Sequence, residues 1–272
     1  MILLSGVILF NCTSEVEHDT LEYYMGKYYD TNTSEPFSGK AIKRYPDQSI
    51  MSITSYKGGK RNGSYIKYWA GGQKLKEFEY TDGELDGTSE WWYENGQKAS
   101  TGEYHKGKQD GIHISWHENG QKSSKGEYSD GENVGTYEEW HENGRRDIEV
   151  DFSDGEMDGT YKWWYENGQI MFEVELEDGK INGSYEYWYE NGQKRVAIDE
   201  VVGSKFENLF EIFRTVYRIS ESESARKEET IKCNGTYREW YENGELHWKA
   251  EFDDGIMDGD IKEWSESGKR LN

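Results

Sequence analysis

The sequence is built on a repeat with an interval of 24 residues. In each copy a glycine opens a short aromatic run, and the run ends at Asn-Gly or a substitute for it. The clearest copy is Gly159–Gln169, which reads G-T-Y-K-W-W-Y-E-N-G-Q. The opening glycines stand at positions 39, 63, 87, 111, 135, 159 and 183, and again at 235 and 259. A period of this length indicates an array in which each unit packs on its neighbours.

Each copy is predicted to be a β-hairpin. In the copy that starts at Gly159, residues 160–165 and 170–176 form the two strands, and Asn167-Gly168 forms a two-residue type I′ turn between them. The five residues 178–182 then form a return loop to the next copy. The predicted fold class is therefore all-β, an elongated array of antiparallel hairpins with a 24-residue period that forms one twisted sheet.

The predicted register places particular aromatic side chains opposite each other. Residues that face each other across a turn share one face of the sheet. In this register Tyr161 lies opposite Val174, Trp163 lies opposite Phe172, and Trp164 lies opposite Met171. The face that carries Tyr161 and the aliphatic residues is predicted to be the packed face, and the other face carries the acidic residues.

One tryptophan per copy forms a column on the predicted acidic face. Two interpretations of this column stay open: each indole packs on the neighbouring strands, or the column is a ladder that binds a ligand or a partner. The candidate binding residues are Trp92, Trp116, Trp140, Trp164, Trp188, Trp240 and Trp264.

The charge of the chain limits its partners. Lys and Arg number 32 against 54 Asp and Glu, which gives a formal net charge of −22. Such a field repels phosphate backbones and anionic lipid headgroups, so a nucleic acid is not an expected partner. A protein with a basic surface fits better, and a cationic or glycan ligand for the tryptophan column is the alternative. Aromatic residues make up 15% of the chain, which argues against disorder.

The amino-terminal segment is predicted to be a signal. Residues 1–10 are apolar and too few to span a bilayer, which needs about 20 residues. Leu9-Phe10-Asn11-Cys12 resembles a bacterial lipobox, and that resemblance implies lipidation of Cys12. We therefore predict a lipoprotein signal over 1–12, a tether over 13–36 and a lipid-anchored location in the cell envelope; a cytoplasmic location is the alternative. The membrane would then be reached only through Cys12.

The hairpin repeats are predicted over 37–198 and 233–272, with a break between them. Residues 199–232 lose the pattern. Apolar residues from Phe206 to Tyr217 fall at helical spacing, but the segment Phe210–Phe213 is also similar to Tyr185–Trp188. We favour a degenerate hairpin with a lengthened loop over an inserted helix.

The sequence contains no motif that predicts catalysis, so we expect no catalytic residue and no cofactor. The common nucleophile, zinc-hydrolase and phosphate-loop motifs do not occur. His113, His117 and His141 hint at a metal site, and the stacked Asp-Gly return loops hint at calcium, but the spacing of these loops matches neither the EF-hand nor the nonapeptide calcium repeat. Because other copies place Tyr at the positions of these histidines, we interpret them as substitutes for a structural aromatic and predict no metal.

The motif D-G-x-x-D/N-G-x-Y-x-x-W-Y-E-N-G-Q-K resembles the bacterial variant of the MORN repeat, found in proteins labelled as YwqK-type antitoxins. The resemblance covers residues 37–269 except 199–232. It implies an elongated antiparallel sheet and a role in protein interaction, scaffolding or neutralisation of a partner toxin. The chain is therefore predicted to bind rather than to catalyse.

Overall fold

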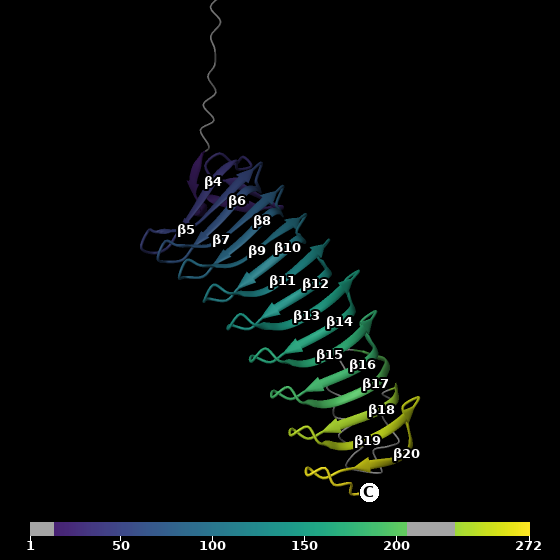
Figure 1. Cartoon of the computed structure of the whole chain (residues 1–272). Helices are drawn as coiled ribbons and strands as arrows, with labels where there is room; N and C mark the ends of the chain where they lie inside the picture. The colour runs from purple at the N-terminus through teal and green to yellow at the C-terminus, as the bar shows by residue number, and fades with distance from the viewer. Residues whose placement is uncertain (1–13, 206–231) are drawn as a thin grey trace, which may run out of the picture. The chain divides into compact units, whose positions relative to one another are not determined.

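The computed structural model describes residues 14–205 and 232–272 (Figure 1). Cys12 and the rest of the predicted signal lie outside the described residues, as does 206–231, the larger part of the predicted break. Eighteen strands are hydrogen-bonded into one sheet, and two more strands form a separate hairpin. The predicted all-β array of hairpins is thus confirmed. No helix in the described part of the chain has the length and apolar character that a membrane span requires.

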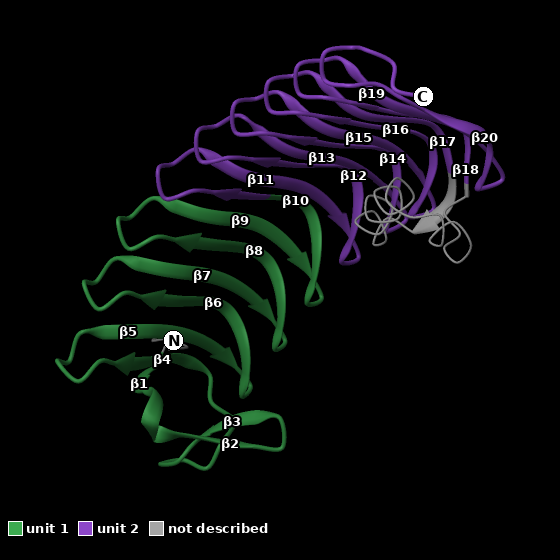
Figure 2. Cartoon of the chain, turned by 90° about the horizontal axis from the view of Figure 1, so that it is seen from below, with its two compact units in different colours: residues 1–113 green, residues 114–272 purple. Residues whose placement is uncertain are grey.

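The chain divides into two compact units, residues 1–113 and 114–272 (Figure 2). Unit 1 contains the strands β1 (Glu15–Glu17), β2 (Leu21–Tyr24), β3 (Lys27–Asp30), β4 (Gly39–Arg44), β5 (Ile50–Lys57), β6 (Lys60–Tyr68), β7 (Lys74–Thr81), β8 (Glu84–Trp92) and β9 (Lys98–His105). Strand β10 (Lys108–Trp116) contains the boundary between the units.

In unit 1 each strand from β4 to β9 pairs antiparallel with the next, and β1 pairs parallel with β4. The segment predicted as a tether is folded from Ser14 on, because β1, the 3₁₀ turn His18–Thr20 and the β2–β3 hairpin occupy it. Phe37, Ala41 and Tyr56 are buried where this segment packs on the sheet. The ring of Tyr28 lies 4.9 Å from that of Tyr56, so this tyrosine docks the β2–β3 hairpin on the sheet.

Unit 2 is a run of ten strands in chain order, each antiparallel to the next. Figure 1 shows them side by side. They are β11 (Lys122–Ser129), β12 (Glu132–Trp140), β13 (Arg146–Ser153), β14 (Glu156–Trp164), β15 (Ile170–Glu177), β16 (Lys180–Trp188), β17 (Lys194–Lys205), β18 (Lys232–Trp240), β19 (Leu246–Asp253) and β20 (Ile256–Glu263).

The core of unit 2 lies on one face of its sheet. Tyr185, Ile181 and Val174 are almost completely buried there. The predicted pairs Tyr161–Val174 and Trp163–Phe172 are both present, which places these side chains on the packed face as expected. The other face carries the tryptophan column and the charged side chains.

The two kinds of turn are exchanged relative to the sequence prediction. Asp178-Gly179 is the two-residue turn, and both residues have positive φ, at 48° and 69°. At Asn167-Gly168 only the glycine has positive φ, and the amide of Gly168 donates to the carbonyl of Tyr165 over 2.8 Å. This is a three-residue loop that ends in a left-handed glycine, so the type I′ prediction for Asn-Gly is wrong. The predicted return loop at 180–182 is part of β16.

A bulge corrects the third predicted pair. The register shifts after Trp163, so that Trp164 lies opposite Ile170 and not Met171. The longer loop at Tyr165–Gln169 explains the shift, because it leaves one extra residue on β15. The same shift before the loop recurs at β6, β8, β12, β16 and β18.

Candidate binding surface

The seven tryptophans of the predicted binding column are all half-buried. Several have a cation from an adjacent strand over the indole ring. Lys74 lies 5.3 Å from the centroid of Trp92, and Lys122 lies 5.6 Å from that of Trp140. Arg146 and Lys194 cover Trp164 and Trp188 at 5.9 Å and 5.5 Å. The cations of the chain itself therefore already occupy the position that a cationic ligand would take.

The main-chain carbonyls of the column tryptophans accept hydrogen bonds that link successive copies. The aromatic residue that follows each of five of these tryptophans donates a hydrogen bond to the carbonyl of the tryptophan in the next copy. Tyr165 Oη donates to Trp188 O over 2.8 Å, and Tyr241 Oη to Trp264 O over 3.0 Å. His117 Nε2 lies 2.7 Å from Trp140 O, and His141 Nε2 lies 3.0 Å from Trp164 O. These two histidines thus take the place of a structural tyrosine.

An asparagine ladder runs along the same edge. Asn167 Nδ2 donates to the carbonyl of Glu190 in the next copy over 2.7 Å, while its Oδ1 accepts from the amide of Gln169. Equivalent bonds start at Asn119, Asn143, Asn191 and Asn243. The sequence predicts only the turn role of Asn, because the acceptor of the second bond is a main-chain carbonyl of another copy.

The asparagine ladder holds the main-chain carbonyl of one exposed glutamate in each of five copies of unit 2. These residues are Glu142, Glu166, Glu190, Glu242 and Glu266. Successive copies are two strands apart, so neighbouring glutamates are held about 10 Å apart along the edge. We call this row the glutamate edge.

Two sets of bonds continue across the break in the repeat: the asparagine ladder, and the bonds to the tryptophan carbonyls, which we call the tyrosine ladder. Tyr189 Oη donates to Trp240 O, and Asn191 Nδ2 donates to Glu242 O; each bond spans 51 residues. The corresponding bonds elsewhere in the ladders span 23 residues. Strands β17 and β18 pair directly, with Ile198 opposite Tyr237.

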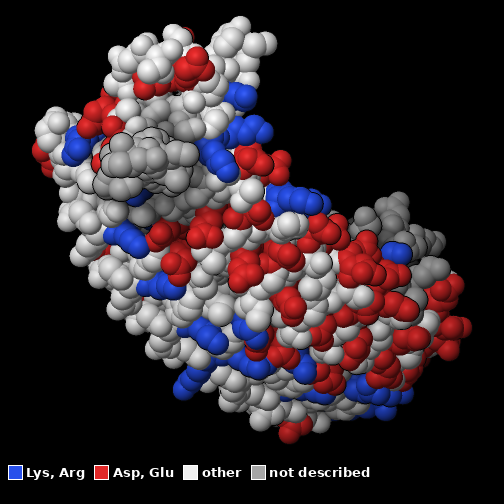
Figure 3. All heavy atoms as spheres, turned by 90° about the horizontal axis from the view of Figure 1, so that it is seen from above, with Lys and Arg blue, Asp and Glu red and all other residues white. Residues whose placement is uncertain are grey.

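Acidic residues are concentrated in unit 2. Residues 1–113 contain 13 Lys and Arg against 16 Asp and Glu, a net charge of −3. Residues 114–272 contain 19 against 38, a net charge of −19. In Figure 3 acidic side chains crowd one part of the visible surface, and basic side chains lie among acidic ones elsewhere. The asymmetry can be counted in the sequence, although the boundary comes from the structure.

Several basic side chains of unit 2 are paired within the sheet. Lys162 lies 3.6 Å from Glu173, and Arg238 lies 2.8 Å from Asp199. Arg146 bridges Glu138 and Glu149. Because these cations are already engaged, the excess of carboxylates determines the field outside the unit.

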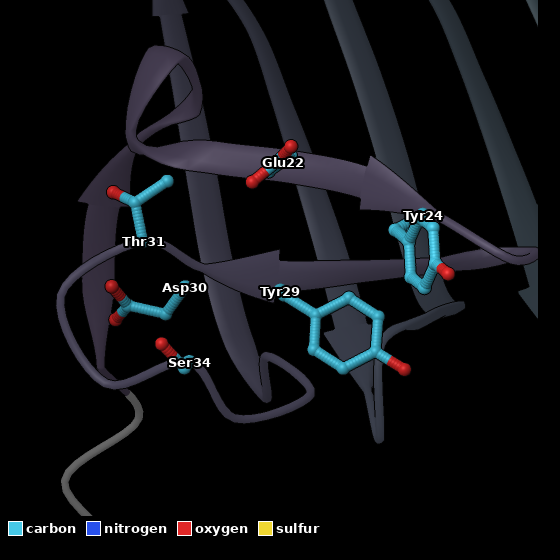
Figure 4. A pocket seen from close by; sticks show the side chains of 6 residues that line it. All are labelled: Glu22, Tyr24, Tyr29, Asp30, Thr31 and Ser34. Carbon is cyan, nitrogen blue, oxygen red and sulfur yellow. The ribbon is translucent and has the colours of Figure 1, made fainter.

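A hollow of about 340 Å³ lies on the β2–β3 hairpin of unit 1 (Figure 4). Its lining consists of Glu22, Tyr24, Tyr29, Asp30, Thr31 and Ser34. Tyr24 is 62% exposed. The hollow therefore offers phenol, hydroxyl and carboxylate groups at an open surface.

Ionisable groups in the core of unit 2 are held neutral. Burial raises the pKa of Tyr161 to about 12, and the carboxylates of Glu139 and Asp147 add to the shift. Burial likewise raises the pKa of the Cys233 thiol to about 11, so this thiol is a core residue and not an activated nucleophile. Within residues 14–205 and 232–272, no three His, Cys, Asp or Glu side chains are grouped so as to hold a metal ion.

The sequence was compared with known families and proteins. The family model described as the MORN repeat variant matches residues 85–106, 109–130, 157–178 and 234–254, about a third of the chain. A search among curated proteins gave no match. Each matched segment ends on the first residue of a two-residue turn at an Xaa-Gly pair, as 157–178 ends on Asp178 of Asp178-Gly179. The chain therefore carries MORN repeats of the variant type, a repeat that supports a binding or scaffolding role.

Proposed function

We propose that the chain is a non-enzymatic scaffold that binds another protein through unit 2, and that this partner presents a basic surface. The observation that carries the proposal is the net charge of −19 in unit 2, displayed on a sheet whose recurring residues hold the copies together. The Trp, Tyr and Asn of the motif serve the ladders. The exposed glutamates are the recurring side chains left to face a partner.

The glutamate edge gives this interaction a geometry. Its carboxylates stand at a regular spacing of about 10 Å on a backbone fixed by hydrogen bonds. A rigid row of like charges favours a partner with cations at a matching spacing and raises the rate of encounter at low salt.

The test uses the full chain and a labelled peptide of alternating Lys and Ser as the probe. Binding should fall by at least 10-fold from low to high salt, because surface charges are screened. The variant Glu142→Gln, Glu166→Gln, Glu190→Gln should bind the probe several-fold more weakly. The matched control removes three exposed acids from unit 1, by Glu22→Gln, Glu35→Gln and Glu84→Gln. An equal loss in the control, or no loss in either variant, contradicts the proposal.

Neutralisation of a basic toxin is one form that such binding can take. Encoded neighbours of the chain are the place to look for the toxin, and co-expression with it should restore growth of the host. We further propose that the scaffold is anchored in the cell envelope through a lipid on Cys12, with a cytoplasmic location as the alternative. Labelling with a radioactive fatty acid, with Cys12→Ala as the control, tests the anchor; an unlabelled wild-type chain contradicts it.

A cell-surface role, with a cationic or glycan ligand on the tryptophan column, is the alternative function. It has less support, because the chain's own Lys and Arg cover several of the indole rings. Titration of tryptophan fluorescence with choline and with cell-wall glycans tests this alternative, and an unchanged spectrum rejects it.

A further inference from the structure

A row of cations crosses the sheet of unit 1 on the face opposite its tryptophan column. The registers of β4 to β8 align Lys43 with Ser52, Ser52 with Lys67, Lys67 with Lys76, and Lys76 with Trp91. Arg61 lies on the same face, opposite Tyr56. We call Lys43, Arg61, Lys67, Lys76 and Trp91 the cationic face.

The cationic face contains a pair that destabilises the sheet. Lys67 and Lys76 are directly opposite each other on adjacent strands, an arrangement in which like charges repel. Within the described chain neither lysine forms an ion pair, and neither does Arg61. The residues that share this face on β5 to β9 include Thr54, Tyr65, Phe78, Ser89 and Gly102, and none of the aligned positions holds an acid. A chain with 54 acidic residues thus leaves its adjacent cations unneutralised here.

Aromatic rings hold these cations in place. Lys76 Nζ lies 4.5 Å from the ring centroid of Trp91 and 4.9 Å from that of Phe78. The guanidinium of Arg61 lies 5.4 Å from the ring of Tyr80 and 5.9 Å from that of Tyr65. Trp91 remains 37% exposed, and Lys67 and Lys76 are half-buried, so the surface is pre-formed and open.

The local field is positive. Burial lowers the pKa of Lys76, and the charges of Lys67 and Arg61 lower it further. The pKa of His18 is lowered by its burial and by Lys43 and Arg61, although Asp19 acts in the opposite direction. An anion placed between these cations would remove the repulsion among them.

Unit 2 holds different residues in the same row. From β13 to β17 its registers align Ile148, Trp163, Phe172, Tyr187 and Val196, all apolar or aromatic. Glu139, Glu239 and Glu263 occupy the row on other strands of unit 2. The hairpin therefore does not require lysines in this row.

We propose that the cationic face of unit 1 binds an acidic segment of a partner protein, with a carboxylate between Lys67 and Lys76 and apolar side chains on Phe78 and Trp91. Carboxylates suit the lysine pair, and the exposed Trp91 beside the half-buried Phe78 suits a peptide with apolar residues next to its acids. A short acidic segment carries few charges, whereas long polyphosphate chains and anionic membranes carry many and are repelled more strongly at long range by the net charge of −22. This site differs from the proposed function in unit, face and partner charge, so the chain would bring a basic and an acidic surface together.

The test measures binding of a labelled short peptide of alternating Glu and Phe to the full chain by fluorescence anisotropy. The variant Lys67→Gln, Lys76→Gln should bind it at least 10-fold more weakly. The matched control is Lys74→Gln, Lys98→Gln, which removes the same charge from lysines that pair with Glu77 and Glu90. This control should bind the peptide as the wild type does.

Thermal unfolding provides the second readout. Lys67→Gln alone should leave the Tm unchanged or raise it, because it relieves a repulsion; a fall in Tm would assign this lysine to the fold instead. The proposal is overturned if a peptide with Gln in place of Glu binds equally well, or if the control variant loses as much affinity. It is also overturned if single-stranded DNA or anionic vesicles bind the lysine pair in preference to the acidic peptide.

Discussion

In unit 2 the packed face of the sheet carries Val174, Ile181 and Tyr185, and these side chains are almost completely buried. In unit 1 the row that corresponds to Trp163, Phe172 and Tyr187 carries Lys67, Lys76 and Trp91, and Trp91 is 37% exposed. The hairpin is the same in both, with the same two turns and the same bulge. The repeat therefore specifies the backbone. The side chains on this one face determine whether a copy stabilises the fold or exposes a binding surface.

The largest expected effect comes from removing a core ring of unit 2. Tyr185→Ala should lower the free energy of unfolding by about 3–5 kcal/mol, because the side chain has an exposed fraction of 0% and leaves a cavity. Trp91→Ala in unit 1, which is 37% exposed, should lower it by less than half as much. Urea denaturation followed by circular dichroism measures both. Equal losses of unfolding free energy in the two variants would contradict the difference between the units.

A smaller effect is expected at a glycine of unit 1. A Cβ added at Gly102 would lie 2.1 Å from Nδ1 of His113, so Gly102→Ala should destabilise the chain by about 1–3 kcal/mol. The additional change His113→Ala should recover part of that loss, which a double-mutant cycle measures. Gly71→Ala is the control, because nothing lies within 4 Å of its added Cβ.

The asparagine ladder should contribute less per residue. Asn167→Ala removes one hydrogen bond to the next copy and one within the turn, and should reduce stability by about 1–2 kcal/mol. Asn167→Asp keeps the acceptor within the turn and loses the donor, so it should fall between the wild type and the alanine variant. Urea denaturation of the three proteins gives the order.

High pH provides the mildest perturbation. Tyr161 has a pKa of about 12 in the folded chain, above the ordinary value of 10.0, so the neutral phenol favours the folded state. Its contribution is complete below pH 10 and is lost as the pH rises towards 12. Ultraviolet absorbance of tyrosinate should therefore show a transition near pH 12 that is absent from the Tyr161→Phe variant, and this variant should lose less stability at high pH. A single tyrosine transition near pH 10 would contradict the expected burial.

Much of the fold follows from the sequence. The 24-residue period and the alternation in residues 170–176 are sufficient to place Tyr161 opposite Val174. The turns were exchanged because Asn-Gly and Asp-Gly both permit positive φ at two residues. Local propensity alone does not show whether Asn-Gly or Asp-Gly forms the two-residue turn. In the structure Asp178-Gly179 forms it, while Asn167 forms a hydrogen bond to the next copy.

The candidate sites were harder to predict. The tryptophan column was recognised, but the cations that cover it come from an adjacent strand and depend on the bulge. The cationic face was missed for the same reason: Lys67 and Lys76 become neighbours only once the register of β6 and β7 is known. His117 and His141 were interpreted correctly, since a tyrosine in other copies makes the same bond.

The hydrogen bonds of Tyr189 and Asn191 reach over 51 residues of chain, yet they join the same groups as bonds that reach over 23. Adjacency in this array is therefore independent of distance along the polypeptide. A foreign domain could be grafted between β17 and β18, or new chain ends opened there, and the neighbouring copies would still recognise each other.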